Sequence, residues 1–203
     1  MFILQYSRHG YRLSKFKRKV FRSLRLIEKE FDVKYGKGKT IFIENCNDLF
    51  AEEVPEFFIL RVLDHCNDWP ENTYVFQTKN PARYKAYLDY FPPDFILGTT
   101  IETNRLYPWI SKAPAPVLRY EAMMRLPETT ETFITLEPIL DFDIDILASW
   151  MNHLCFDFIN LGADSKNHGL PEPTVEKIMA FTERLKDYGI ELREKHNLAR
   201  LKP

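Results

Sequence analysis

Short apolar runs alternate with longer amphipathic segments from residue 40 onward, and this alternation constrains the fold more than any other feature of the sequence. Five runs are rich in β-branched and aromatic residues and almost continuously apolar, which is typical of strands that are covered on both faces. They are TIFIE (40–44), TYVFQT (73–78), FILGTTI (95–101), TFITLEP (132–138) and FDFINLG (156–162).

The segments between these runs carry apolar residues at positions i, i+3, i+4 and i+7, which predicts helices. The helical spacing covers residues 59–66, 84–91, 144–151 and 175–185. Gly189 then precedes a last strand candidate, IELRE (190–194). Strands that alternate with helices at this pitch predict right-handed βαβ units and a parallel sheet, which is either open or rolled into a barrel.

The first 40 residues differ from the rest of the chain in charge. They carry 12 Lys and Arg residues against 3 Asp and Glu residues, a net charge of +9, whereas the remainder has a net charge of −10. We expect a basic strand-loop-helix segment at about residues 1–39, with MFILQY (1–6) as the first strand and residues 15–31 as the first helix. This segment is either a solvated face that complements the acidic remainder or a contact for nucleic-acid phosphates. The candidate nucleic-acid contacts are Lys15, Lys17, Arg18 and Lys19.

Length and cysteine content favour one intracellular domain. With 203 residues and 45% hydrophobic content, the chain can bury one substantial core, so we expect a single α/β domain over residues 1–203. No apolar run approaches the roughly 18 residues that a membrane helix needs, and MFILQYS is too short for the apolar part of a secretory signal. Three widely spaced cysteines argue against a disulfide framework. We therefore expect a cytoplasmic protein with no membrane partner.

Polar residues lie at the end of each apolar run or directly after it. In a parallel α/β protein the carboxyl ends of the strands converge on one face, which is where such folds place their ligands. We therefore expect these side chains to meet around one cavity. The candidate ligand-binding residues are Asn45, Gln77, Lys79, Glu102, Asn104, Arg105, Glu137, Asp164 and Lys166.

A structural role is the alternative for several of these groups. Charges at strand ends are costly unless they are paired or used, so a structural ion-pair network competes with a binding pocket. This alternative applies to Lys79, Glu102, Arg105 and Glu137. Asp143, before IDIL, is typical of a helix N-cap.

Several common metal-binding and nucleotide-binding motifs are absent from the sequence. No HxH, HExxH or CxxC spacing, no P-loop and no GxGxxG occurs, so the sequence does not indicate a zinc site or a phosphate-binding loop. The carboxylates of Glu137, Asp141 and Asp143 leave a hard cation open as an alternative.

Several consecutive phrases resemble a known family. The phrases that carry the resemblance are, in order, KGKTIFIENCNDLFAEEVPEFFILRVLDHC, FQTKNPARY, ILGTTIETNR, TLEPILDFD and FINLGADSKNHGLPEP. They are similar to a phage and archaeal family of the radical S-adenosylmethionine (radical-SAM) superfamily that is characterised by a three-cysteine motif. The similarity spans roughly residues 24–201. The resemblance implies a parallel, partial (β/α)6 TIM-like barrel of radical-SAM type.

The resemblance also gives a meaning to SRHGYRLS, residues 7–14. Members of the family carry a CxxxCxxC loop after the first strand, whose thiolates hold a [4Fe-4S] cluster, and the free iron of the cluster chelates S-adenosylmethionine. The His-Gly pair of that loop corresponds to His9 and Gly10, but Ser7, Tyr11 and Ser14 stand at the three cysteine positions. Hydroxyl oxygens are poor ligands for such clusters. We therefore expect no cluster and no radical chemistry.

The three cysteines of the chain do not readily replace the motif. We expect Cys66 on a helix face and Cys155 just before a strand, so that only Cys46 would reach the carboxyl ends of the strands.

Three functions follow from these observations. The first is a degenerate radical-SAM-like protein that keeps a nucleotide or S-adenosylmethionine pocket without radical chemistry. The second is an enzyme of another kind, which uses the carboxylates and lysines of the same cavity for hydrolysis or transfer. The third is a nucleic-acid-binding module that uses the basic segment from Arg8 to Arg25. The sequence leaves the catalytic residues, the substrate and the oligomeric state open.

Overall fold

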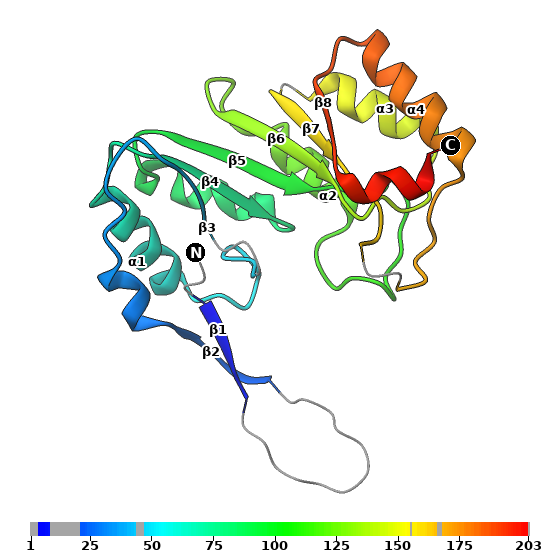
Figure 1. Ribbon diagram of the computed structural model, residues 1–203. Coiled ribbons are helices and arrows are strands. Elements are labelled where there is room, and N and C mark those ends of the chain that lie inside the picture. Colours follow the sequence, from blue (N-terminus) through cyan, green and yellow to red (C-terminus); the bar gives the residue numbers. More distant parts are fainter. Residues whose placement is uncertain (1–3, 9–20, 44–46, 155, 166–167, 203) are drawn as a thin grey trace, which may run out of the picture.

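The structure is a computed structural model, and it describes residues 4–8, 21–43, 47–154, 156–165 and 168–202. Its main feature is an open sheet of six parallel strands flanked by helices (Figure 1). The strands are β3 (Thr40–Ile43), β4 (Thr73–Thr78), β5 (Phe95–Thr100), β6 (Glu131–Leu136), β7 (Phe158–Leu161) and β8 (Leu192–Glu194). The prediction of a parallel sheet with helical crossovers is confirmed.

Helical segments connect the successive strands. The four α-helices are α1 (Glu56–Asn67), α2 (Pro116–Met123), α3 (Ile144–His153) and α4 (Val175–Asp187). The 3-10 helix η2 (Pro81–Tyr90) also lies between two strands, and a further 3-10 helix, η3 (His196–Leu201), follows β8. No helix in the described part of the chain is long and apolar enough to cross a membrane.

The strand order β3-β4-β5-β6-β7-β8 follows the chain without a reversal. Because parallel crossovers are right-handed, an order that never reverses places all crossover helices on the same face of the sheet. The contacts agree, since α1 lies against η2, η2 against α2, and α3 against α4. Tyr120 of α2 also stacks on Trp150 of α3, with the ring centroids 4.8 Å apart. The helices therefore form one continuous layer, and the other face of the sheet carries no crossover helix.

The helix-facing side of the sheet is apolar and buried. Leu97, Ile134 and Ile159 lie there at no measurable exposure, and they pack against helix residues such as Leu63 of α1 and Phe181 of α4 in one core cluster. Burial of this apolar surface is the main stabilising contribution to such a fold.

The opposite face of the sheet changes from apolar to polar toward the carboxyl ends of the strands. Gly98, Phe133 and Phe158 lie in register on β5, β6 and β7, and the two rings stack with centroids 5.2 Å apart. A Cβ atom on Gly98 would lie 2.2 Å from the Phe133 ring, so glycine is required for this packing. Two residues further along, Thr100, Thr135 and Asn160 form the next row.

The start of the chain does contain a strand, as predicted, but this strand does not join the parallel sheet, and the helix predicted after it is wrong. Residues 4–8 (β1, Leu4–Arg8) pair antiparallel with β2 (Phe21–Leu26) in a separate two-stranded sheet, and a 3-10 helix, η1 (Glu28–Asp32), follows. Figure 1 shows this hairpin projecting from the α1 end of the molecule. In the described part of the predicted helix, residues 21–26 form a strand, and only the short η1 is helical.

The physical reason is a period of two in the second half of the predicted helix. Leu24 and Leu26 pack against the core, whereas Arg25 between them is exposed. This alternation is typical of a strand with one buried face. Residues 15–20 of the predicted helix lie outside the described part of the chain.

Candidate functional site

The carboxyl ends of the parallel strands border a cavity of about 440 Å³, which we call the rim cavity. Its lining is Phe42, Gln77, Thr135, Glu137, Pro138, Asn160, Ala163, Asp164, Ser165, His168 and Lys195. Phe42 and Gln77 also line a smaller hollow of about 170 Å³ beside it, so the two spaces are neighbours on the face without helices. This is where the sequence predicted a ligand site.

The floor of the rim cavity is a row of hydroxyl and amide side chains. Gln77 Nε2 donates a hydrogen bond of 2.8 Å to Thr100 Oγ1, which fixes the amide. Thr135 is only 6% exposed, and its Oγ1 has no hydrogen-bond partner among the described residues. A buried hydroxyl without a partner costs free energy, and native structures contain few of them. Thr135 also belongs to the lining of the rim cavity.

Glu137 lies above this row, just after β6. Asn197 Nδ2 donates to Glu137 Oε1 over 2.8 Å and to the Ala163 carbonyl over 2.7 Å, which holds the carboxylate in place. A Cβ atom on Gly162 would lie 2.9 Å from both Glu137 and Asn197, so only glycine leaves room for this pair. One oxygen of Glu137 is therefore held by the protein, while the residue lines the cavity.

Asp164 and His168 form a hydrogen-bonded pair at the side of the cavity. His168 Nδ1 lies 2.8 Å from Asp164 Oδ1, and the Asp164 side chain is only 4% exposed whereas that of His168 is 58% exposed. Arg200 donates to the Asp164 carbonyl over 3.0 Å and pairs with Glu172, which fixes the loop from the outside. A buried carboxylate that orients an exposed imidazole is the arrangement of a general acid or base.

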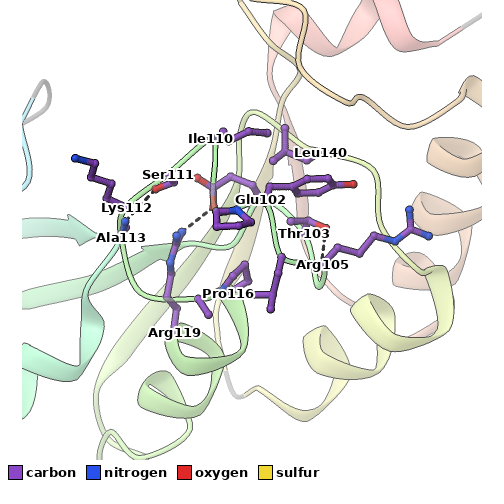
Figure 2. Close-up of a pocket in the computed structure, with 14 residues that line it drawn as sticks. Glu102, Thr103, Arg105, Ile110, Ser111, Lys112, Ala113, Pro116, Arg119 and Leu140 are labelled. Carbon is purple, nitrogen blue, oxygen red and sulfur yellow. Dashed lines mark hydrogen bonds and ion pairs between the residues drawn. The ribbon is translucent and has the colours of Figure 1, made fainter.

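Glu102, in the loop after β5, is hydrogen-bonded both to Lys79, which lines the small hollow, and to Arg119 of helix α2. Its carboxylate accepts a hydrogen bond from Lys79 Nζ. It also accepts one over 2.7 Å from Arg119 Nη1 of α2 (Figure 2). The side chains of Glu102 and Arg119 are 7% and 2% exposed. These three groups carry a net charge of +1 and form the structural ion-pair network that the sequence left as an alternative.

A second ionic cluster, which we call the loop clasp, lies between the loops after β5 and β6 and helix α4. It consists of Asn104, Arg105, Asp141, Asp143 and Lys177. Arg105 binds both aspartates, Asn104 exchanges two hydrogen bonds with Asp143, and Lys177 Nζ donates to Asp141 over 2.5 Å.

Hydrogen bonds from Arg105 first and Asn104 second lower the pKa of Asp143 from its usual 3.8 to about 2. Burial tends to raise the pKa of Asp141, but the hydrogen bond and charge of Lys177, together with Arg105, outweigh it and lower that pKa. Asp143 is the N-cap residue of α3, as predicted, but its side chain makes no capping hydrogen bond. Both aspartates are occupied by cationic side chains, and the described residues include no cluster of metal ligands.

The structure distributes the predicted ligand-binding residues over three places. The rim cavity holds Gln77, Glu137 and Asp164. Lys79 and Glu102 lie in the network with Arg119, and Asn104 and Arg105 lie in the loop clasp. Asn45 and Lys166 lie outside the described residues.

The predicted cluster loop and nucleic-acid contacts fall almost entirely outside the described residues. This concerns His9, Gly10, Tyr11, Ser14, Lys15, Lys17, Arg18 and Lys19. Ser7 lies inside strand β1 and therefore not in a loop after a strand of the parallel sheet. Cys66 is on α1, as expected, and burial raises the pKa of its thiol, whereas Cys46 and Cys155 are not described.

Sequence reasoning missed residues of the rim cavity that come from strand interiors or from distant segments. They are Thr135, Asn160, His168 and Lys195. Sequence reasoning also missed Asn197, which donates to Glu137. For Thr135 a signal existed in TFITLEP, because a residue between Ile134 and Leu136 must face away from the helices.

Comparisons with known proteins give a family and nothing further. The profile of a family described as "Protein of unknown function (DUF5131)" matches residues 5–165. A search of curated proteins found no match, and neither did a search of solved structures. The match covers most of the chain, and the protein therefore belongs to this family of unknown function, DUF5131.

Proposed function

We propose that the protein binds a small, polar, nucleoside-like ligand in the rim cavity, with S-adenosylmethionine as the first candidate. The scaffold in this proposal is a partial (β/α)6 TIM-like barrel of radical-SAM type that has lost its iron-sulfur cluster. The strand order supports it, because six successive parallel strands with all helices on one face are what an unclosed β/α barrel requires.

The observation that carries the proposal is the unpartnered hydroxyl of Thr135. Thr135 is 94% buried and lines the cavity of about 440 Å³, and its Oγ1 has no hydrogen bond among the described residues. A ligand that hydrogen-bonds to it would remove a desolvation cost of about 1–3 kcal/mol. A purely structural cavity would gain nothing from a hydroxyl at this position.

The other lining groups match the chemistry of S-adenosylmethionine. Glu137 offers a carboxylate to an amino group or to ribose hydroxyls, and Lys195 offers an ammonium group to a carboxylate. Gln77 and Asn160 add amide donors and acceptors beside Thr135. Cations, anions and hydroxyls of one ligand would each find a partner in this cavity.

A [4Fe-4S] cluster does not fit the residues of this chain. Ser7, Tyr11 and Ser14 would present hydroxyl groups to iron. Cys66, the one cysteine in the described part of the chain, is buried in the core on α1. We therefore propose binding of the ligand without its reductive cleavage.

Isothermal titration calorimetry with S-adenosylmethionine tests the proposal. We expect binding to one site, weakened about tenfold by Glu137→Gln because a charge-assisted hydrogen bond is lost. The matched control is Glu191→Gln. Glu191 is an exposed residue just before β8 that pairs with Arg193 and does not line the cavity. The absence of any binding heat, or equal weakening by both variants, would reject the assignment.

Anaerobic incubation with iron and sulfide tests the loss of the cluster separately. We expect a colourless protein after removal of excess iron. A stable brown protein with the absorption of a [4Fe-4S] cluster would contradict this part of the proposal, whatever the outcome of the titration.

The Asp164–His168 pair favours a second candidate, an enzyme that uses acid-base chemistry in the same cavity. The buried carboxylate holds Nδ1 of the imidazole, so that Nε2 is left to accept or donate a proton. Turnover of a bound nucleoside that is lost in His168→Gln, with unchanged ligand affinity, would support catalysis. Unchanged turnover in that variant would exclude this pair as the acid or base.

A further inference from the structure

A second cavity of about 440 Å³ lies between the loop after β5 and helix α2, and we call it the α2 cavity. Figure 2 shows it with Glu102 and Arg119 at one side. Apart from these ionic groups, its lining is mostly apolar, with Leu106, Tyr107, Ile110, Pro116 and Leu140 as the larger members. None of the residues of the rim cavity lines it.

Arg119 is the unusual group in this cavity. Its side chain is only 2% exposed, and a guanidinium group has five N–H donors. Nε donates to the Pro114 carbonyl over 2.6 Å, while Nη1 donates to the Thr100 carbonyl over 2.8 Å and to Glu102 over 2.7 Å. Nη2 has no hydrogen bond among the described residues, although the side chain lines the cavity. Nη2 is not one of the fully enclosed unpartnered atoms, so its two donors are accessible and can bind an acceptor in the cavity.

The local charge favours an anionic acceptor. Glu102 shares its carboxylate between Arg119 and Lys79, so these three groups keep a net charge of +1. Arg105 also lines the cavity, but in Figure 2 its guanidinium points away from it, toward its partners in the loop clasp. An anion beside Nη2 would therefore face a net positive charge within a weakly hydrated environment, where the interaction is strong.

We propose that the α2 cavity binds a carboxylate with an apolar body. Its carboxylate accepts hydrogen bonds from Nη2 of Arg119, and its apolar part packs between Leu106, Tyr107 and Leu140. Mostly apolar walls with one fixed charged group are the usual construction of a small-molecule site. Leu106 is 66% exposed at the edge of the cavity, so a bound apolar group would also cover its side chain.

Calorimetry with 4-phenylbutyrate and with its uncharged analogue 4-phenylbutyramide tests the proposal on the full chain. We expect the acid to bind about tenfold more tightly than the amide, because the charge-assisted hydrogen bonds to arginine are lost in the amide. Equal affinities, or no binding of the acid at millimolar concentration, would overturn the proposal.

Two substitutions of Leu106 locate the binding. Its exposed side chain can change without loss of the core, whereas a variant of buried Arg119 could simply fail to fold. We expect Leu106→Glu to weaken 4-phenylbutyrate binding about two- to fivefold through repulsion at a partly exposed site, and Leu106→Lys to keep or strengthen it. If both variants bind the acid equally well, the α2 cavity is not the site and the proposal fails. Binding of S-adenosylmethionine in the rim cavity should be unchanged in both variants.

Discussion

The loop clasp and the rim cavity are both polar clusters at the carboxyl ends of the strands, but they differ in how far their groups are satisfied. In the loop clasp, Arg105, Asp141 and Asp143 bind one another, and Lys177 completes the set. In the rim cavity, Thr135 is buried without a partner in the described part of the chain. Both clusters would look alike in the sequence, as polar residues after apolar runs.

The difference separates structural from ligand-binding polar groups. A saturated cluster stabilises the loops that it joins, and a ligand would have to break existing hydrogen bonds to bind there. In a cluster with an unpartnered polar group, a ligand breaks no existing hydrogen bond at that group and supplies the missing one. We therefore expect substitutions in the saturated networks to change mainly stability, and substitutions in the rim cavity to change mainly binding.

The largest effect is expected for the saturated network around Glu102. Glu102→Ala would leave Arg119, which is 2% exposed, as a buried charge without a counterion. Breaking a buried pair in this way costs about 3–5 kcal/mol of unfolding free energy, which urea denaturation would measure. Glu121→Ala, which removes the exposed pair with Arg125, should cost less than about 0.5 kcal/mol. Equal losses for the two variants would show that the Glu102 network does not stabilise the fold.

The loop clasp should contribute less, because its groups are partly exposed. Arg105 is 37% exposed in its side chain, so solvent screens its ion pairs. Arg105→Ala should cost about 1–2 kcal/mol in the same denaturation assay, since several charge-assisted hydrogen bonds are lost together. It should leave the affinity for S-adenosylmethionine unchanged. A loss of that affinity with unchanged stability would place Arg105 in the binding site instead.

The acid stability of the protein should depend on the same clasp. The pKa of Asp143 falls from 3.8 to about 2 on folding, so its contribution to stability is present above about pH 4 and is lost as the pH falls toward 2. Because Arg105 is the main cause of this shift, Arg105→Ala should show a smaller fall in stability over this range. Denaturation between pH 5 and pH 2 measures it, and parallel curves for the two proteins would contradict the assignment.

The smallest effects should distinguish two threonines of the sheet. Thr99 is fully buried and donates to the Thr78 carbonyl over 2.8 Å, so Thr99→Val should lose about 1 kcal/mol. Thr135 has no such bond, so Thr135→Val should be neutral or stabilising by up to about 1 kcal/mol in the free protein. Its ligand affinity should fall nevertheless. A destabilisation of Thr135→Val equal to that of Thr99→Val would mean that the hydroxyl is already satisfied.

The sequence predicted the parallel sheet because its strands are short, apolar and regularly spaced. It failed for β1 and β2, where Leu24 and Leu26 alternate with a charged residue and the basic composition suggested a helix. The period of two in that short stretch was the better signal, but it competed with the expectation that the βα alternation begins at the first residue.

For the site, position at or just after the carboxyl end of a strand found Gln77, Glu137 and Asp164, because the carboxyl ends of parallel strands necessarily meet. The same rule could not distinguish these cavity residues from Arg105, which forms ion pairs with Asp141 and Asp143 instead. It also could not find Asn197, whose contact with Glu137 spans 60 residues of sequence. Such contacts depend on tertiary packing and leave no local pattern.

A crystal structure of the protein grown with S-adenosylmethionine tests the central claim most directly. We predict density for the ligand in the rim cavity, with a ligand atom within about 3.2 Å of Thr135 Oγ1. An empty cavity in which a side chain from residues 44–46 or 166–167 occupies that hydrogen-bonding position would contradict the account, because the hydroxyl would then need no ligand.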